Sequence, residues 1–183
     1  MARADAWASP SLGGLGGFCW IDNTLKWFHI AVTLESLPVE WHVVDLSLAI
    51  AALECLAQAA LLVLRFKIVA VPFQQELVVH QQCDNMPSVG AASKMLSTKP
   101  PLSLALQVLA SNCMAHKCTA RLTHIAGARN EWADAASRLN MPVQAPPLPS
   151  DFSAVNKEHI ELDDVLAPWR QIMAISNPAS SQC

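Results

Sequence analysis

Short apolar stretches bounded by turn residues occupy the first third and the middle of the chain. Apolar runs of this length are typical of β-strands when Gly, Pro, Asn or Asp residues bound them. Asp22-Asn23-Thr24 is such a turn signal, and it predicts that the stretches on either side form an antiparallel pair. The five predicted strands are Ala2–Trp7, Leu15–Ile21, Leu25–Val32, Leu77–Cys83 and Cys118–Ile125.

Longer apolar segments alternate with the later strands and predict helices. The longest follows Asp45 and Ser47, either of which can cap a helix that runs to about Arg65. The short apolar stretch Ile68–Phe73 ends this element. Three more helices are expected over Pro87–Leu96, Leu102–His116 and Asn130–Leu139. The order β-β-β-α-β-α-α-β-α predicts an α/β domain in which helices flank a five-stranded mixed sheet.

The composition changes near residue 140. Four prolines between Pro142 and Pro149 are followed by a stretch with five acidic residues between Asp151 and Asp164. Pro-rich segments are typical of linkers, and acidic segments with few aromatic residues are typical of tails. We therefore expect a domain over residues 1–140, and a linker and acidic tail over residues 141–183 with a short helix around Asp163–Ile175.

One apolar segment, Leu46–Leu64, is long enough to be considered for a membrane span. Glu54 and Gln58 lie at its centre, and a carboxylate in the middle of a bilayer is costly. A helix that is apolar on all sides can instead be the central helix of a soluble domain. The sequence favours the buried helix over the single membrane span.

Composition limits the remaining classes. Of 183 residues, 52% are hydrophobic and 15% are charged, so the chain can form a sizeable core. The formal net charge of -3 argues against binding nucleic acid through bulk positive charge. The six cysteines form no C-x-x-C pair and most lie in apolar runs, as in reduced intracellular proteins. Without a signal-peptide pattern at the N-terminus, we expect an intracellular protein, cytoplasmic or nuclear.

Four acidic residues lie at the ends or starts of predicted elements. Asp5 is on the first strand, Glu54 early in the long helix, Asp84 after the fourth strand and Asp134 at the start of the last helix. For Asp134 alone, a favourable interaction with the helix dipole is the simpler explanation. If the four meet, however, their carboxylates repel one another unless cations lie among them. Clustered carboxylate oxygens suit Mg²⁺ or Mn²⁺.

The segments around these acids resemble the ribonuclease H domain of retroelement polyproteins, nearest to the kind found after the reverse transcriptase of tyrosine-recombinase (DIRS-like) elements. The resemblance covers about Ala2–Leu139, and its most specific part is the last motif. The motifs are Ala4-Asp5-Ala6 before Gly13-Gly14-Leu15-Gly16-Gly17, Leu53-Glu54-Cys55-Leu56, Cys83-Asp84-Asn85 before Val89, and His124-Ile125-Ala126-Gly127 with Asn130, Ala133-Asp134 and Ser137-Arg138-Leu139.

The resemblance implies a ribonuclease H-like fold and an enzyme that hydrolyses the RNA strand of RNA/DNA hybrids with two Mg²⁺ ions, for which Mn²⁺ can substitute. Asp5 would bridge both ions, Glu54 and Asp84 would serve the ion that activates water, and Asp134 the ion on the leaving-group side. His124 would assist proton transfer or product release, or would only be a strand-end residue.

Asn85 and Asn130 are the predicted substrate contacts, although Asn130 also suits a helix N-cap.

Two departures from the family pattern leave an alternative open. The first strand starts close to Asp5 and looks truncated, which suggests a piece of a longer polyprotein with an upstream reverse-transcriptase domain. The predicted helix Leu102–His116 has no Lys or Arg, so the basic surface with which free-standing ribonucleases H grip their substrate is missing. The alternative is a decayed ribonuclease H-like module with only a structural or nucleic-acid-binding role.

Overall fold

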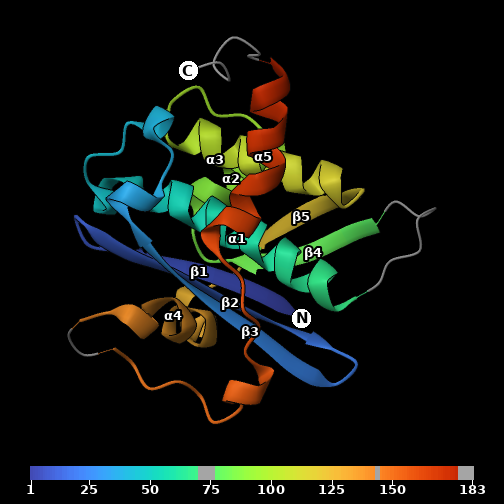
Figure 1. The fold of residues 1–183 in the computed structure, drawn as a ribbon. Coiled ribbons are helices and arrows are strands. Elements are labelled where there is room, and N and C mark those ends of the chain that lie inside the picture. The colour runs from blue at the N-terminus through green and yellow to red at the C-terminus, as the bar shows by residue number, and fades with distance from the viewer. Residues whose placement is uncertain (70–76, 143–144, 177–183) are drawn as a thin grey trace.

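A computed structural model describes residues 1–69, 77–142 and 145–176 and contains a five-stranded mixed sheet flanked by helices (Figure 1). The strands are β1 (Ala2–Ala8), β2 (Leu12–Ile21), β3 (Thr24–Thr33), β4 (Leu77–Cys83) and β5 (Cys118–His124). Their order across the sheet is β3-β2-β1-β4-β5. The first three strands pair antiparallel, whereas β4 runs parallel to both β1 and β5. The predicted α/β class and mixed sheet are confirmed.

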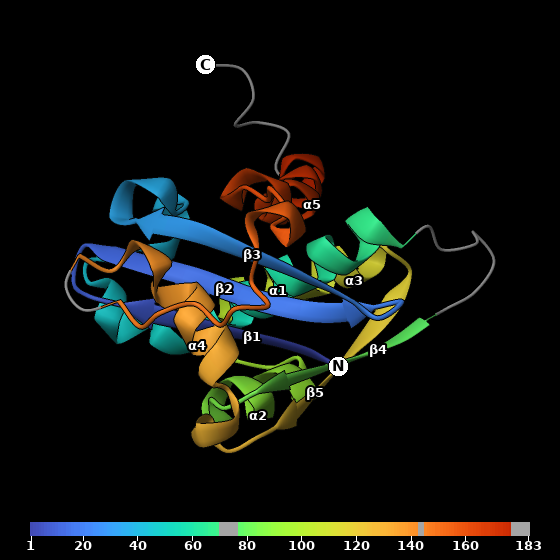
Figure 2. The ribbon, with the colours of Figure 1, turned by 90° about the horizontal axis from the view of Figure 1, so that it is seen from below.

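The helices are α1 (Ile50–Ile68), α2 (Met86–Lys94), α3 (Leu102–Ala115), α4 (Glu131–Ser137) and α5 (Leu162–Ser176). Short 3₁₀ turns cover Leu34–Ser36, Val39–Trp41, Leu46–Ala49, Gly127–Arg129, Arg138–Asn140 and Ala154–Asn156. Figures 1 and 2 show that α4 lies on one face of the sheet, whereas α1, α3 and α5 lie on the other.

The β2–β3 hairpin shows how the sequence determines a local structure. Ile21 pairs with Thr24, so the turn between them has only two residues. These are Asp22 and Asn23, which have φ angles of 48° and 61°. Asp and Asn tolerate this left-handed conformation better than other residues with side chains, and it matches the twist of the flanking strands. The predicted turn is therefore where the sequence places it.

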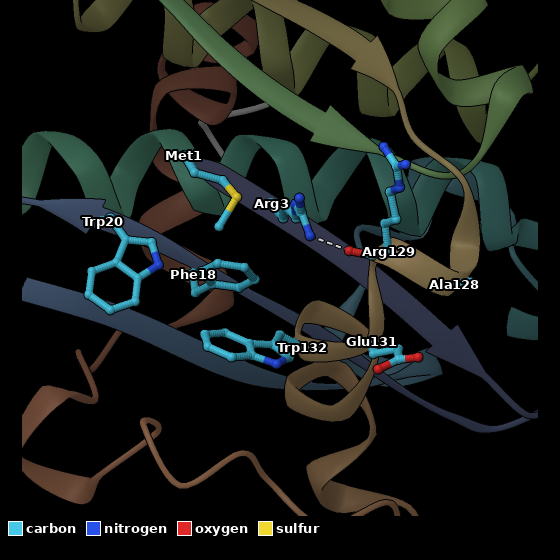
Figure 3. A pocket seen from close by; sticks show the side chains of 8 residues that line it. All are labelled: Met1, Arg3, Phe18, Trp20, Ala128, Arg129, Glu131 and Trp132. Carbon is cyan, nitrogen blue, oxygen red and sulfur yellow. Dashed lines mark hydrogen bonds between the residues drawn. The ribbon is translucent and has the colours of Figure 1, made fainter.

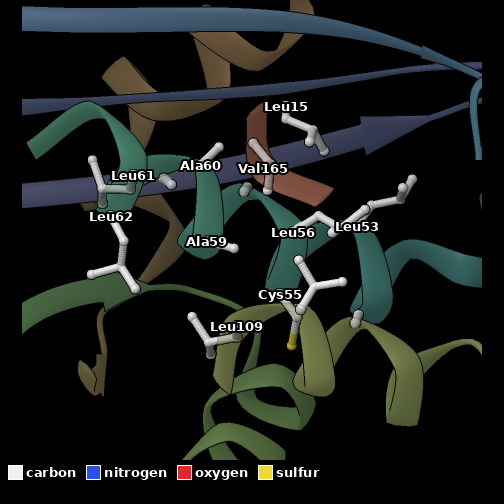
Figure 4. Close-up of a cluster of buried hydrophobic side chains, with 14 of the residues drawn as sticks. Leu15, Leu53, Cys55, Leu56, Ala59, Ala60, Leu61, Leu62, Leu109 and Val165 are labelled. Carbon is white, nitrogen blue, oxygen red and sulfur yellow. The ribbon is translucent and has the colours of Figure 1, made fainter. Parts of the chain in front are cut away.

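Helix α1 is the centre of the main core. Its leucines pack against Leu15 of β2, Leu109 of α3 and Val165 of α5 (Figure 4). The segment Leu46–Ile68 is long and apolar enough to cross a membrane by length and composition, but most of it is buried inside the fold. Gln58 is also buried, and its side-chain amide donates to the carbonyl of Ala4 at 3.2 Å. The prediction of a buried central helix is confirmed.

The boundaries of this helix differ slightly from the prediction. A 3₁₀ turn, Leu46–Ala49, comes first, and the Asp45 side chain rather than Ser47 caps it by accepting from the Ser47 N–H at 2.8 Å. The α-helix then continues to Ile68. Most of the stretch predicted over Ile68–Phe73 lies outside the described residues.

The described residues after residue 140 pack on the sheet and its helices. Phe152 joins Phe18, Trp27 and Trp132 in a second cluster on the α4 face. The chain then passes the outer edge of β3, where the Glu158 N–H donates to the carbonyl of Trp27 at 2.8 Å. Beyond this edge α5 covers α1 and α3, and its buried residues are Leu162, Val165, Leu166 and Trp169.

Division into a domain over residues 1–140 and a separate tail stays a prediction. The described part of the tail is nevertheless packed on the fold rather than extended from it. The predicted helix around Asp163–Ile175 is present as α5.

Candidate active site

Four acidic residues from four separate elements lie near the parallel strand pair β1–β4. Asp5 lies in the middle of β1, and Glu54 in the second turn of α1. Asp84 directly follows β4, and Asp134 lies in the first turn of α4. The charges of Asp84 and Asp134 both act on the Asp5 carboxyl. Asp5 is therefore within electrostatic range of the other three acids that the sequence singled out, and Glu54 and Asp84 lie closest together.

Asp5 and Glu54 form the buried half of this group. Only 3% of Glu54 is exposed, and its side chain shares a hydrogen bond with Asp5. Burial, together with repulsion by Asp5, raises the pKa of Glu54 to about 10. Burial also raises the pKa of Asp5 to about 6, although the hydrogen bond from Glu54 opposes this rise. Without a cation, Glu54 is therefore a neutral acid at pH 7 that donates to the Asp5 carboxylate.

Asp84 is partly exposed and is held by the loop between β5 and α4. The Asn130 side-chain amide donates to Asp84 Oδ1 at 3.3 Å. Gly127 lies close to the same group, because a Cβ at that position would be 3.3 Å from Asp84 Oδ2. The loop thus contacts one side of the Asp84 carboxylate, and the other side remains available to face the neighbouring acids.

The position of Asp134 depends on the glycines of β2. A Cβ on Gly14 would lie 2.1 Å from the Ser137 carbonyl oxygen, and one on Gly16 would lie 2.1 Å from the Ser137 nitrogen. Only glycine permits this approach of α4 to the sheet. Gly16 is also the partner of Asp5 in the β1–β2 register. The close contact therefore brings α4, and Asp134 with it, next to Asp5.

Arg138 is a neighbour of the site to which the sequence analysis assigned no role. Its Nε donates to Asp134 Oδ1 at 2.6 Å, and both side chains are about a third exposed. The signal was available in the sequence, since an acid and a base four residues apart lie side by side on a helix. This ion pair holds the Asp134 carboxylate in place and partly offsets the negative charge of the group.

Cys83 is the second neighbour that the sequence analysis did not place in the site. Its Sγ lies 3.6 Å from Glu54 Oε2. Ligand atoms of Glu54, Cys83 and Asp84 all lie within 4.8 Å of one another. Burial raises the pKa of the Cys83 thiol, so the thiol is protonated at pH 7. Its position directly before Asp84 was the signal that could have revealed it.

The three other predicted site residues have different environments. His124 is the exposed last residue of β5 and lies opposite Cys83 in the β4–β5 register. The Asn85 side-chain oxygen caps α2 by accepting from the Ser88 N–H at 3.0 Å. Asn130 is fully buried, and the expectation that its side chain caps α4 is wrong, because the side chain turns toward Asp84 instead.

The donor set fits divalent cations with a preference for oxygen ligands. The four carboxylates supply hard oxygen atoms, and burial together with repulsion from neighbouring acids raises the pKa values of Asp5 and Glu54. Cations there would remove the repulsion and allow both acids to ionise. The arrangement can therefore accommodate Mg²⁺ or Mn²⁺ between carboxylates.

Comparisons of the sequence alone identify no relative: no protein-family model and no curated protein matches it. Comparison of the fold is informative. The chain is similar to ribonuclease H1 from the halophilic archaeon Halobacterium salinarum NRC-1, with a TM-score of 0.53 and 15% identity over 75% of this chain and 92% of that one. It is also similar to LC11 ribonuclease H1, solved in complex with an RNA/DNA hybrid, with a TM-score of 0.53 and 16% identity over 75% and 92%.

A third match is the N-terminal ribonuclease H domain of Rv2228c from Mycobacterium tuberculosis, with a TM-score of 0.51 and 18% identity over 75% of this chain and 88% of that one. All three structures share the mixed sheet and its flanking helices with this chain, at identities too low to indicate more than the fold. The chain therefore has a ribonuclease H-like fold.

Proposed function

We propose that the protein is a metal-dependent endonuclease that hydrolyses the RNA strand of RNA/DNA hybrids. The observation that carries this proposal is that, on a ribonuclease H-like fold, Glu54 and Asp84 lie close together near Asp5, on which the charge of Asp134 also acts. The fold alone would not suffice, because one fold hosts many functions. The hybrid bound in the LC11 ribonuclease H1 structure supports the choice of substrate class.

The four acids would hold two Mg²⁺ ions, or Mn²⁺ in their place. Asp5 would serve both ions, because the charges of both Asp84 and Asp134 act on it. Glu54 and Asp84 would serve the ion that activates water, and Asp134 would serve the ion that stabilises the leaving group. When bound, such ions activate water and stabilise the leaving oxygen of a phosphodiester.

The other residues have supporting roles in this proposal. His124 is exposed at the end of β5, close to Asp84 in the sheet, where its imidazole can transfer a proton at the edge of the site. Asn85 is partly exposed and can contact the nucleic-acid backbone through its amide nitrogen while its oxygen caps α2. Asn130 is buried, so we assign it to the orientation of Asp84 rather than to direct substrate contact.

The biological setting rests on the sequence motifs alone. A retroelement polyprotein, an upstream reverse-transcriptase domain and an intracellular location, cytoplasmic or nuclear, are the setting that those motifs suggest. In such a polyprotein the polymerase domain would supply the basic surface that α3 lacks, because α3 contains no Lys or Arg. This division of labour would make binding by the isolated chain weak and sensitive to salt.

A cleavage assay on a labelled RNA/DNA hybrid tests the proposal. We expect the protein to cut the RNA strand in Mg²⁺ or Mn²⁺ but not in Ca²⁺, which takes looser coordination. Asp84→Asn keeps the shape of the side chain and removes one charge, so the rate should fall by about 10²-fold or more. Asp22→Asn is the matched control, because Asp22 lies in the exposed β2–β3 turn, where Asn is equally suited to a positive φ.

The outcome distinguishes an active nuclease from a ribonuclease H-like module without activity. A folded protein that gains stability from Mg²⁺ but cuts no hybrid would reject the nuclease. The alternative, a ribonuclease H-like module with a structural or nucleic-acid-binding role, would then be the better description.

A further inference from the structure

A cleft of about 330 Å³ opens beside the four acids and belongs to none of the roles assigned above (Figure 3). We call it the Trp20 cleft and define it by its lining residues, which are Met1, Arg3, Phe18, Trp20, Ala128, Arg129, Glu131 and Trp132. We infer that the Trp20 cleft binds an unpaired nucleotide of a strand that extends beyond the hybrid. This inference rests on the proposed function, since it concerns the path of the same substrate.

The Trp20 cleft adjoins the site along β1. Arg3 lies two residues before Asp5 on the same strand, so the two side chains share one face of the sheet. The opposite wall is the loop and helix start that also carry Asn130 and Asp134. A strand leaving the carboxylates along β1 would therefore pass over this cleft.

Aromatic rings form one side of the Trp20 cleft. Phe18 is buried and packs against Trp132, with ring centroids 5.6 Å apart. Trp20 is 39% exposed, and Figure 3 shows its ring to one side of Phe18. An exposed tryptophan face is a suitable platform for any nucleobase, because every base has a π-face. This wall therefore favours stacking without selecting a sequence.

A fixed guanidinium lines the other side. Arg3 Nε donates to Gln82 Oε1 at 2.9 Å, and a terminal nitrogen of Arg3 donates to the carbonyl of Arg129. Both partners are neutral, so these bonds orient Arg3 without cancelling its charge. Within the described parts of the chain, neither Arg3 nor Arg129 forms a salt bridge. In Figure 3 the Glu131 carboxylate points away from Trp20.

This combination identifies the kind of occupant. A base stacked on Trp20 would place its phosphate toward the positive charge of Arg3, and guanidinium groups bind phosphate well. The volume lies at the lower end of the range of small-molecule sites, about 300–1,000 Å³, which admits a single nucleotide but no base pair. A purely apolar peptide would leave the charge of Arg3 without a partner, so an unpaired nucleotide fits better.

The test compares binding of a blunt hybrid with hybrids that carry a short single-stranded extension at either end. Fluorescence anisotropy of the full chain in Ca²⁺ avoids cleavage. We expect the favoured extension to tighten binding by about tenfold, since stacking of one base contributes about 1–3 kcal/mol. Trp20→Ala should abolish this gain, and Trp20→Phe should keep part of it. Leu48→Ala, at an exposed apolar residue elsewhere on the surface, should keep all of it.

Two results would overturn the inference. One is a wild-type protein that binds blunt and extended hybrids equally, which would leave the cleft to a protein partner. The other is a Trp20→Ala variant, shown to be folded by its urea transition, that retains the full gain from the extension. The proposed nuclease is tested separately: a protein that prefers the extended hybrid but cuts nothing in Mg²⁺ would keep this inference and reject the enzyme.

Discussion

The buried Asp5–Glu54 pair allows a direct test of the charge state of the site, through the substitution Glu54→Gln. Gln has nearly the shape of a protonated Glu, and its amide can still donate to Asp5. The substitution therefore preserves the packing and the hydrogen bond and removes only the proton that Glu54 can lose. A difference in pH dependence between the two proteins then reports the titration of Glu54 and of Asp5, which interacts with it.

The size of the expected change in stability with pH follows from the pKa of Glu54, which burial raises from 4.5 to about 10 on folding. Because the pKa is raised, its contribution to stability is fully present below about pH 4.5 and is lost as pH rises toward 10. Between these limits the folded protein holds one proton more than the unfolded chain. The free energy of unfolding of the wild type should therefore fall, relative to Glu54→Gln, by about 1.4 kcal/mol per pH unit.

Urea unfolding in EDTA, followed by tryptophan fluorescence at about pH 6, 7 and 8, measures this difference, which should total about 3 kcal/mol over the range. Because the pKa of Asp5 is raised to about 6, Asp5 is still partly protonated at the lowest pH, and the slope between about pH 7 and 8 is the clearer measure of Glu54. Glu40→Gln at an exposed position controls for the change from acid to amide. If the stability of the wild type and of Glu54→Gln depends on pH in the same way, Glu54 is ionised in the folded protein in EDTA. The interpretation that Glu54 is a neutral hydrogen-bond donor to Asp5 would then be wrong.

The remaining predictions concern metal binding, the glycines and the tail. In the same urea assay, Mg²⁺ should stabilise the wild type more at about pH 8 than at about pH 6, because Glu54 must lose its proton to bind metal. An equal increase in stability at both pH values would contradict this prediction. Gly16→Ala should destabilise the protein by about 1–3 kcal/mol or more, because the added Cβ would overlap the backbone of α4. Gly90→Ala in α2 is the control and should stabilise the protein by about 0.5–1 kcal/mol, because open space surrounds Gly90. Similar urea midpoints for the two variants would refute the tight contact at Gly16. Trp169→Ala should lower the free energy of unfolding by about 3–5 kcal/mol, measured by thermal or urea unfolding. Ile175→Ala is the control and should change it very little, because Ile175 is 82% exposed. If Trp169→Ala leaves the stability unchanged, α5 is not part of the folded core in solution.

Elements with strong local signals were predictable from the sequence. The strand Leu77–Cys83 and the helix after Pro101 have nearly their predicted limits, because an apolar run and a clear boundary coincide there. The start of β2 was missed by three residues, since Gly13 and Gly14 have low strand propensity. These glycines form strand because they pair with β1 and face the end of α4, which is information that no local window contains.

The acids of the site were predictable by type, but their environment was not. Aspartates at element ends were recognisable in the sequence, whereas the contact of Cys83 with Glu54 requires β4 and α1 to be placed in space. The same holds for Asn130, where the local pattern favours an N-cap and the tertiary contact with Asp84 wins. The packing of the tail also escaped prediction, because its apolar residues Leu162, Val165, Leu166 and Trp169 are sparse and interrupted by acids.

A proton on Glu54 and the guanidinium of Arg138 both reduce the repulsion among the acids of the site. Two ionised carboxylates in contact inside a core would repel strongly and push β1 and α1 apart. A proton on Glu54 removes this repulsion and turns it into a hydrogen bond to Asp5. At the exposed end, Arg138 compensates the charge of Asp134 at 2.6 Å. If the site binds Mg²⁺ as proposed, the cation would compete with the proton of Glu54 and with Arg138 for the carboxylates, so binding would depend on pH.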